Sequence, residues 1–292
     1  MIRTAQTLMK IQNRRSVTAT KTALTLPRRF EINSDLFDHV QSRVKQSGST
    51  IEKILITYHD RNGTKKDFLM NRNLSTGYDC AKHINMMIAK RAVLSLVSYP
   101  NEEPRLESMN EPFLDRCNFE LIDFQTEKYA QDVNQAYWRS CSIVLAAALI
   151  KGLKDNIILS ELHCEVPKCY FAVDVIGLSS SLSQDDLRDL TFFIRHDIIS
   201  KNIPFETVTL PSEIAADYGF TSSMKLCRFG DFVTEVDGPV ISRSDQIGRF
   251  DVVKGVTKEG FTRVGGVSLP SAFVASSYLW ETIVENAQDK LS

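Results

Sequence analysis

The chain has 292 residues, of which 43% are hydrophobic and 24% charged, and its formal net charge is −1. This is the composition of a globular protein with one large or two ordinary domains, long enough to bury a substantial core. No apolar run approaches the roughly 20 residues that a membrane span requires, so we predict none.

The charge is distributed unevenly along the chain. Seven basic residues and no acidic residue precede Glu31, so the remainder holds 28 basic against 36 acidic residues, a net charge of −8. A basic, acid-free N-terminus with Thr, Ser and Ala is typical of a mitochondrial transit peptide, and we assign residues 1–30 to a transit peptide or a retained basic arm. Because affinity for phosphate depends on clustered Lys and Arg, we expect any RNA contact to use local basic patches.

The residues after the basic segment predict a lead-in helix and a small module. Residues 31–50 read as a short polar helix with Ser34 as its candidate cap. Within 51–99, two strands flank Asn62-Gly63, a dipeptide that accepts the positive φ angles of a tight hairpin turn. A helix capped at Ser75-Thr76 is expected next, followed by a strand at Ala92–Val97; the predicted inward residues of that helix are Cys80, Ile84, Met87 and Ile88.

The rest of the chain predicts a second α+β domain. Residues 100–118, rich in Pro and Glu, read as a linker, and residues 119–292 as the domain, with Phe119–Phe124 as its first strand. Gln135–Leu149 contains no Pro or Gly and places apolar residues at helical spacing, which predicts a buried helix. Further strands and helices are expected at Leu162–Gly177, Ser183–Ser200, Ser212–Tyr218, Phe250–Val253, Phe261–Pro270 and Ser271–Asp289.

Six cysteines are spread without the spacing of a disulfide framework, so reduced thiols are expected. His163, Cys164 and Cys169 form the one group of metal-ligand types. Structural zinc sites combine two closely spaced ligand pairs, and no second pair follows here. We therefore expect no metal and no cofactor.

Two parts of the chain resemble the N-terminal region of threonyl-tRNA synthetases. The order of elements in the small module and the run Tyr78–His83 are similar to their TGS domain, a ubiquitin-like β-grasp module. Gln135–Leu149 is similar to the editing-domain helix, which the family writes W-H-S-S-A-H-x-L, and Leu226–Ser244 to its Y-R-x-G-x-F-x-D-L-C-x-G-P-H stretch. Pro204–Glu206 and Gly265–Pro270 also match. The residues that keep the two motif frames are Trp138, Ser140, Leu145, Arg228, Gly230, Asp231, Phe232, Gly238 and Pro239.

The resemblance also locates the groups that perform editing, and this chain lacks them. Arg139 and Ile143 stand at the two histidine positions of the first motif, and Val236 and Val240 at the Cys and His positions of the second. An aliphatic side chain can neither ligate a metal nor transfer a proton. We therefore expect no enzyme activity. The aliphatic residues would fill the former pocket, while Arg139 must pair or reach solvent.

This combination of segments, with no aminoacylation domain expected, resembles a synthetase-related family of mitochondrial large-subunit ribosomal proteins. The resemblance implies a structural role in the mitochondrial matrix, with ribosomal RNA and neighbouring large-subunit proteins as partners and no small-molecule substrate. RNA-contact candidates, which can equally form a solvated face, are Lys65, Lys66, Lys90 and Arg91.

Two other functions stay open from the sequence. One is a free-standing deacylase of mischarged tRNA, which needs a water-activating group such as Cys141, Asp237 or His163. The other is a non-ribosomal RNA-binding protein built on the TGS-like module.

Overall fold

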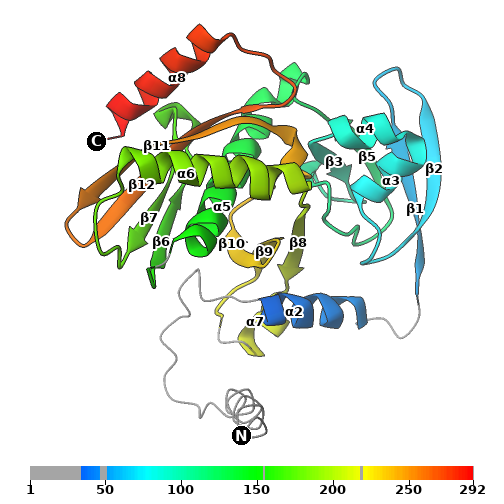
Figure 1. Ribbon diagram of the computed structural model, residues 1–292. Coiled ribbons are helices and arrows are strands. Elements are labelled where there is room, and N and C mark those ends of the chain that lie inside the picture. The colour runs from blue at the N-terminus through cyan, green and yellow to red at the C-terminus, as the bar shows by residue number, and fades with distance from the viewer. Residues whose placement is uncertain (1–33, 47–50, 154, 218–219, 292) are drawn as a thin grey trace, which may run out of the picture.

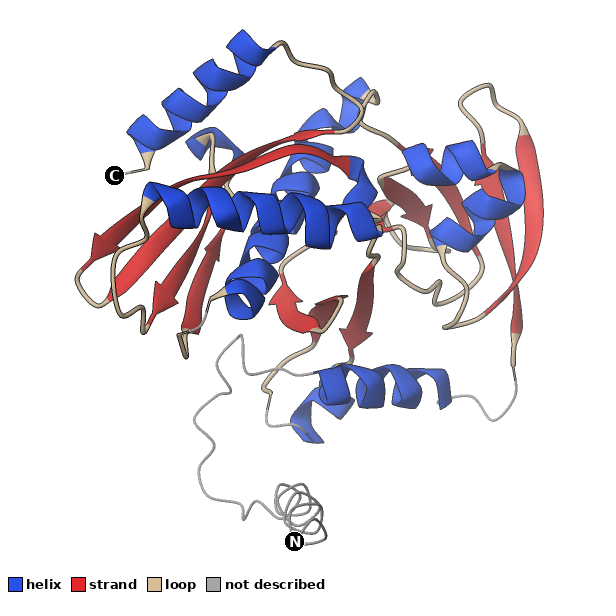
Figure 2. Ribbon diagram, viewed as in Figure 1, coloured by secondary structure: helices blue, strands red, loops and turns tan. Residues whose placement is uncertain are grey.

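The computed structural model describes residues 34–46, 51–153, 155–217 and 220–291. Helices and three β-sheets alternate along this part of the chain, so the predicted α+β class is confirmed (Figures 1 and 2). The segment assigned to a transit peptide or basic arm lies outside the described residues. Within the described residues, none of the helices combines the length and apolar composition needed to traverse a bilayer.

The first sheet has five strands in the order β2-β1-β5-β3-β4. Its strands are β1 Lys53–His59, β2 Lys65–Asn71, β3 Leu94–Ser98, β4 Arg105–Ser108 and β5 Cys117–Ile122. β1 and β5 pair in parallel, whereas the other neighbours are antiparallel. The predicted hairpin between β1 and β2 is confirmed, and Gly63 in its turn has a φ of 79°, a conformation that glycine adopts without steric cost.

Two short helices, α3 Gly77–Ile84 and α4 Met86–Arg91, follow β2 and replace the single helix that the sequence predicts. Thr76 caps α3 in a capping box with Asp79, as predicted from Ser75-Thr76. The helix breaks because Asn85 is extended and its side chain caps α4. Cys80 is buried as expected, but the inward orientation predicted for Met87 is wrong: its side chain is 70% exposed.

The predicted linker over residues 100–118 is wrong, because this segment contains β4 and the start of β5. Met109 and Phe113 within it are buried. The predicted strand Phe119–Phe124 exists as β5, but it pairs with β1 and β3 of the first sheet and does not open the second part of the chain. Its Phe119 ring lies 5.3 Å from Tyr58 and 5.5 Å from Phe113, in the core of the first sheet.

The second sheet has four antiparallel strands in the order β11-β12-β7-β6. Its strands are β6 Ile158–His163, β7 Phe171–Ile176, β11 Ile247–Lys258 and β12 Phe261–Pro270. The helices α5 Ala130–Gly152 and α6 Gln184–Phe193 pack on one face, and α8 Ser277–Lys290 packs on the other (Figure 1). Adjacent residues of β12 show the alternation: Val264 faces α5, whereas a Cβ on Gly265 would lie 1.8 Å from a Leu291 methyl carbon at the end of α8.

The third sheet has three strands in the order β10-β9-β8: β8 Phe205–Leu210, β9 Met224–Phe229 and β10 Phe232–Val236. The short helix α7 Ser212–Asp217 connects β8 and β9. The lead-in helix α2 Ser34–Gln46 is confirmed, but it does not pack on the first sheet that follows it in sequence. Its Phe37 and Val40 are buried against the third sheet, beside Val208, Leu226 and Val233 (Figure 1).

Candidate functional site

The four positions expected at the editing site come from two segments that meet between the second and third sheets. Arg139 and Ile143 are one turn apart on α5, so both side chains lie on the same helix face. Val236 ends β10 and Val240 lies four residues further on. The guanidinium Nη1 of Arg139 donates a hydrogen bond of 2.6 Å to the carbonyl oxygen of Pro239. The two motif segments, about 100 residues apart, are therefore in direct contact.

The segment 239–242 is held in place by hydrogen bonds from side chains of other elements. Ser140 Oγ accepts a hydrogen bond of 2.9 Å from the Ile241 N–H, and Ser108 Oγ accepts one of 2.9 Å from the Val240 N–H. Asn110 Nδ2 donates to the carbonyl oxygen of Ser242 at 2.7 Å. The segment therefore has its backbone donors satisfied by α5 and by the end of β4, which is a rigid arrangement for a buried loop.

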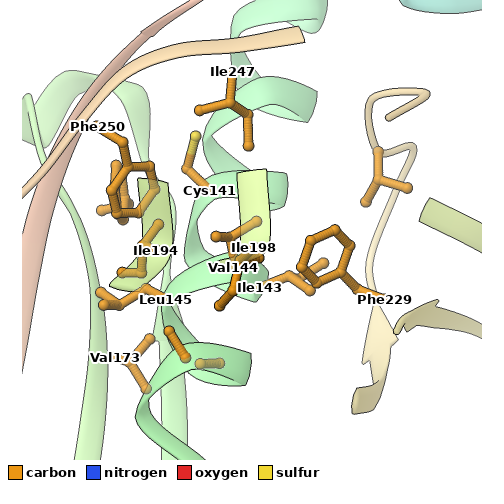
Figure 3. Packing of buried hydrophobic residues seen from close by; sticks show 14 of the residues in the cluster. Cys141, Ile143, Val144, Leu145, Val173, Ile194, Ile198, Phe229, Ile247 and Phe250 are labelled. Carbon is orange, nitrogen blue, oxygen red and sulfur yellow. The ribbon is translucent and has the colours of Figure 1, made fainter. Parts of the chain in front are cut away.

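The side chains at three of the four positions form part of the largest hydrophobic cluster. Ile143 and Val240 have no exposed surface and Val236 is 5% exposed. Figure 3 shows Ile143 on α5 and the Phe229 ring of β9 within the same cluster of buried side chains. Close packing of aliphatic and aromatic groups leaves these positions without an atom that can bind a metal or move a proton.

Arg139 has a different environment from the three aliphatic residues. Its side chain is only partly buried and contacts the Gly238-Pro239 turn. A Cβ on Gly238 would lie 3.0 Å from Nη2 of Arg139, closer than side-chain atoms normally approach. The guanidinium therefore stacks against bare backbone, and glycine at 238 permits that approach.

None of the three alternative water-activating groups stands free at this place. Cys141 is completely buried, and desolvation raises the pKa of its thiol to about 12. Asp237 is exposed beside the Gly238 turn. His163 is on β6, where its Nε2 lies 2.9 Å from Asp174 Oδ2. A buried thiol with so high a pKa is protonated at neutral pH and cannot serve as a base.

His163 belongs to an ionic cluster on the α8 side of the second sheet, formed by residues of β6, β7 and β12. Arg263 donates to both carboxylate oxygens of Asp174 at 2.7 Å, and its Nη2 lies 2.9 Å from His163 Nε2. Burial would raise the pKa of Asp174, but the hydrogen bonds from Arg263 and His163 outweigh it and lower this pKa to about 2. Glu161 lies 3.7 Å from His163. These ligand types could surround a cation, yet the guanidinium of Arg263 already supplies the positive charge next to Asp174.

The cysteines that follow His163 in sequence do not join it. Cys164 Sγ lies 3.5 Å from the side-chain amide of Gln135, whereas Cys169 Sγ lies 3.2 Å from Lys290 Nζ. All six cysteines are free thiols. The structure therefore separates the residues of the one motif that suggests zinc.

The four basic RNA-contact candidates lie in two places on the first sheet and its helices α3 and α4, which together we call the first unit. Lys65 and Lys66 begin the edge strand β2, with Lys66 Nζ 5.3 Å from the Phe68 ring centroid. Lys90 and Arg91 end α4 and are exposed. Arg91 Nε lies 3.0 Å from Asp123 Oδ2, so part of its charge is already neutralised.

The surroundings of Arg91 contain cations that the sequence analysis did not select. Arg61 in the β1-β2 turn donates to Asp123 at 2.7 Å, opposite Arg91. Arg61, Arg91 and Lys128 line one hollow of about 190 Å³ together with Tyr58 and Tyr129. No local pattern marks these residues, because turn and loop positions far apart in sequence supply them.

Comparison with known proteins supplies a relative but no family model, since none matches the chain. The chain is 27% identical over 289 residues to the Drosophila melanogaster protein named Large ribosomal subunit protein mL39. The match covers 87% of this chain and 83% of that protein. The predicted resemblance to a family of mitochondrial large-subunit ribosomal proteins is thus confirmed: the chain is similar to mL39 over most of its length.

Proposed function

We propose that this chain is a structural component of the large subunit of the mitochondrial ribosome. The observation on which the proposal depends is the similarity to mL39 over most of both chains, since an alignment of this length leaves little room for a different domain arrangement. We assign it no catalytic role. Its partners are ribosomal RNA and neighbouring large-subunit proteins, and its compartment is the mitochondrial matrix.

We infer that the two parts of the chain descend from the TGS and editing domains of a threonyl-tRNA synthetase. Two features of the first sheet support this. Its first and last strands, β1 and β5, pair in parallel in the middle, and α3 and α4 cover one face, which is the arrangement of a β-grasp module. The contact between Arg139 and Pro239 supports the second assignment, because it joins the two motifs that form the editing site in the resembling family.

The proposed loss of activity rests on what stands at the four motif positions. Ile143, Val236 and Val240 are buried aliphatic residues in one cluster, and Arg139 binds backbone. A deacylase needs a group that activates water within hydrogen-bond distance of the substrate. The packing of the cluster offers neither the group nor the space, which disfavours the free-standing deacylase.

RNA contacts, on this proposal, are made by the exposed cations of the first unit. Lys65, Lys66 and Arg91 are the candidates retained from the sequence, joined by Arg61 and Lys128 at the hollow beside Arg91. Lys90, the fourth candidate, does not line that hollow and lies instead at a groove beside Ser271 and Ala272. Outside the N-terminal 30 residues the chain has a net charge of −8. A peripheral position, with much of the contact made to proteins, fits this balance better than burial in RNA.

Sedimentation tests the proposal. Mitochondrial lysate is fractionated on a sucrose gradient with magnesium and again after EDTA, and the chain is detected in each fraction. We expect comigration with the large subunit under both conditions, because a resident protein stays with its subunit when the subunits separate. A chain that remained at the top of both gradients would refute the ribosomal assignment, and hydrolysis of mischarged threonine tRNA would then be the activity to assay.

A further inference from the structure

The connection between β12 and α8 presents apolar side chains to solvent. Val274 is 100% exposed, Tyr278 81%, Leu279 50% and Phe273 47%. Residues 271–279 contain no charged side chain, in a chain of which 24% is charged. Single exposed apolar residues are common, but a contiguous group of this kind marks a surface that a partner covers.

The backbone of this connection is held by hydrogen bonds on both sides of Val274. The Ser271 N–H donates to the Gln246 carbonyl at 2.9 Å, and the Phe273 N–H donates to the Pro270 carbonyl at 3.0 Å. Ser276 caps α8 by accepting a hydrogen bond of 3.2 Å from the Leu279 N–H. The apolar side chains therefore project from a fixed backbone, which reduces the entropy that a binding partner must overcome.

A groove of about 400 Å³ extends this surface toward the first unit. Its lining includes Ser271 and Ala272, residues of α4, and Phe124. The Phe124 ring is 6.1 Å from that of Phe273, so the groove and the exposed connection are continuous. On the far side, Met87 is 70% exposed and Lys90 is exposed at the rim. We call residues 271–279 together with Met87 and Lys90 the α8-entry surface.

We propose that the α8-entry surface binds an apolar segment of a neighbouring large-subunit protein, with an acidic side chain of that segment meeting Lys90. RNA is the poorer fit, because residues 271–279 offer no cation to a phosphate. Phe, Tyr and Met are enriched at the centres of protein interfaces. In the described part of the chain no acidic side chain forms an ion pair with Lys90, so its charge is available to a partner.

This inference depends on the proposed ribosomal function, and photocrosslinking in intact subunits tests it separately. The full chain is expressed in mitochondria with a photoreactive phenylalanine analogue at Val274, or at Glu259 in the β11-β12 turn as the control. Large subunits are purified, irradiated and analysed by mass spectrometry. We expect position 274 to crosslink to one large-subunit protein, within a peptide that contains apolar residues and an Asp or Glu.

Each other outcome has a distinct meaning. A labelled chain that does not enter the large subunit would refute the proposed function. A chain that enters the subunit, while position 274 crosslinks to RNA, to a second copy or to nothing, would refute the α8-entry surface and leave the proposed function standing.

A second measurement uses substitutions at exposed positions that leave the core untouched. We expect the double change Val274→Glu and Tyr278→Glu to lower the amount of chain in the large-subunit fraction roughly tenfold, as loss of central interface residues does. Lys90→Glu should reduce it less. The control is Ile150→Glu at the end of α5, an isoleucine that is 48% exposed. Equal loss in the control, or full incorporation of the double variant, would contradict the proposal.

Discussion

Replacing Ile143 by histidine restores the residue type of the resembling enzymes and tests whether this position is core. Ile143 is completely buried among aliphatic and aromatic side chains (Figure 3). Removing it loses the burial of an isoleucine, about 1.5–3 kcal/mol. An imidazole without hydrogen-bond partners adds about 1–3 kcal/mol. We therefore expect Ile143→His to lower the free energy of unfolding by about 4 kcal/mol, a large part of the 5–15 kcal/mol typical of a folded protein.

The assay is urea denaturation of the full chain, followed by the fluorescence of its two tryptophans. Ile143→Val is the matched control and should cost only about 0.5–1.5 kcal/mol. A buried imidazole stays neutral in the folded state, so its pKa there lies below its unfolded value near 6.5, and the cost should grow as the pH falls below that value. A histidine variant within about 1 kcal/mol of wild type at pH 7, with no such pH dependence, would show that a solvated pocket persists and would refute the filled-site argument.

Three further predictions concern buried polar groups. Burial, with the nearby carboxylate of Glu111, raises the pKa of Glu107 to about 7. The free energy of unfolding of the wild type should therefore fall by roughly 3 kcal/mol relative to that of Glu107→Gln as the pH rises from 5 to 8. Denaturation curves whose separation stays constant over this pH range would contradict the prediction. Asp174→Asn should lower the free energy of unfolding by about 3 kcal/mol at pH 7, because it leaves Arg263 without its charge partner. In thermal unfolding, the stability difference between wild type and variant should shrink as the pH falls from about 4 toward 2, where Asp174 becomes protonated. A difference that does not depend on pH would argue against the ion pair. Ser140→Ala should cost about 1–3 kcal/mol in urea, because the Ile241 N–H loses its acceptor, whereas Ser140→Thr should keep most of the stability if the bond is the cause.

Local signals in the sequence predict the local structure of this chain well. Asn62-Gly63 places the first hairpin, and Thr76 and Ser183 mark helix starts that the structure confirms as capping boxes. The helix around Gln135–Leu149 follows from composition and spacing, and the structure only lengthens it. In each case the residues that determine the element lie within a few positions of it.

Pairings between distant segments are what the sequence does not reveal. A segment rich in Pro and Glu reads as a linker, yet Arg105–Ser108 becomes an edge strand because β3 offers it hydrogen-bonding partners. β5 pairs in parallel with β1, about 60 residues earlier, and no local sequence signal predicts this pairing. The strand β8 was not predicted at all, since Phe205–Leu210 lies between two stronger helix signals.

For the candidate site, too, the sequence predicts some features and not others. The resemblance to the synthetases selects Arg139 and Val240, and the structure brings their segments together. That these positions once performed editing remains a prediction. Asp174 pairs with Arg263, 89 residues away, because of the strand register, and Arg61 and Arg91 both pair with Asp123 because of where their turn and helix lie. Hydrophobic periodicity does not encode either arrangement.

The place of α2 has a consequence for the proposed transit peptide, because α2 is part of the folded structure. Ser34 Oγ donates to the Asp231 carbonyl at 3.2 Å, and the Arg228 guanidinium lies 4.5 Å from the Phe37 ring while pairing with Glu206. A protease that cleaved beyond Phe37 would strip the apolar cover from β8, β9 and β10 and leave their side chains open to aggregation. On the proposal that residues 1–30 include a transit peptide, we therefore expect its removal to leave Ser34 and the rest of α2 on the chain. A fragment that began at the first sheet would lack α2 and would expose the apolar face of the third sheet that α2 covers.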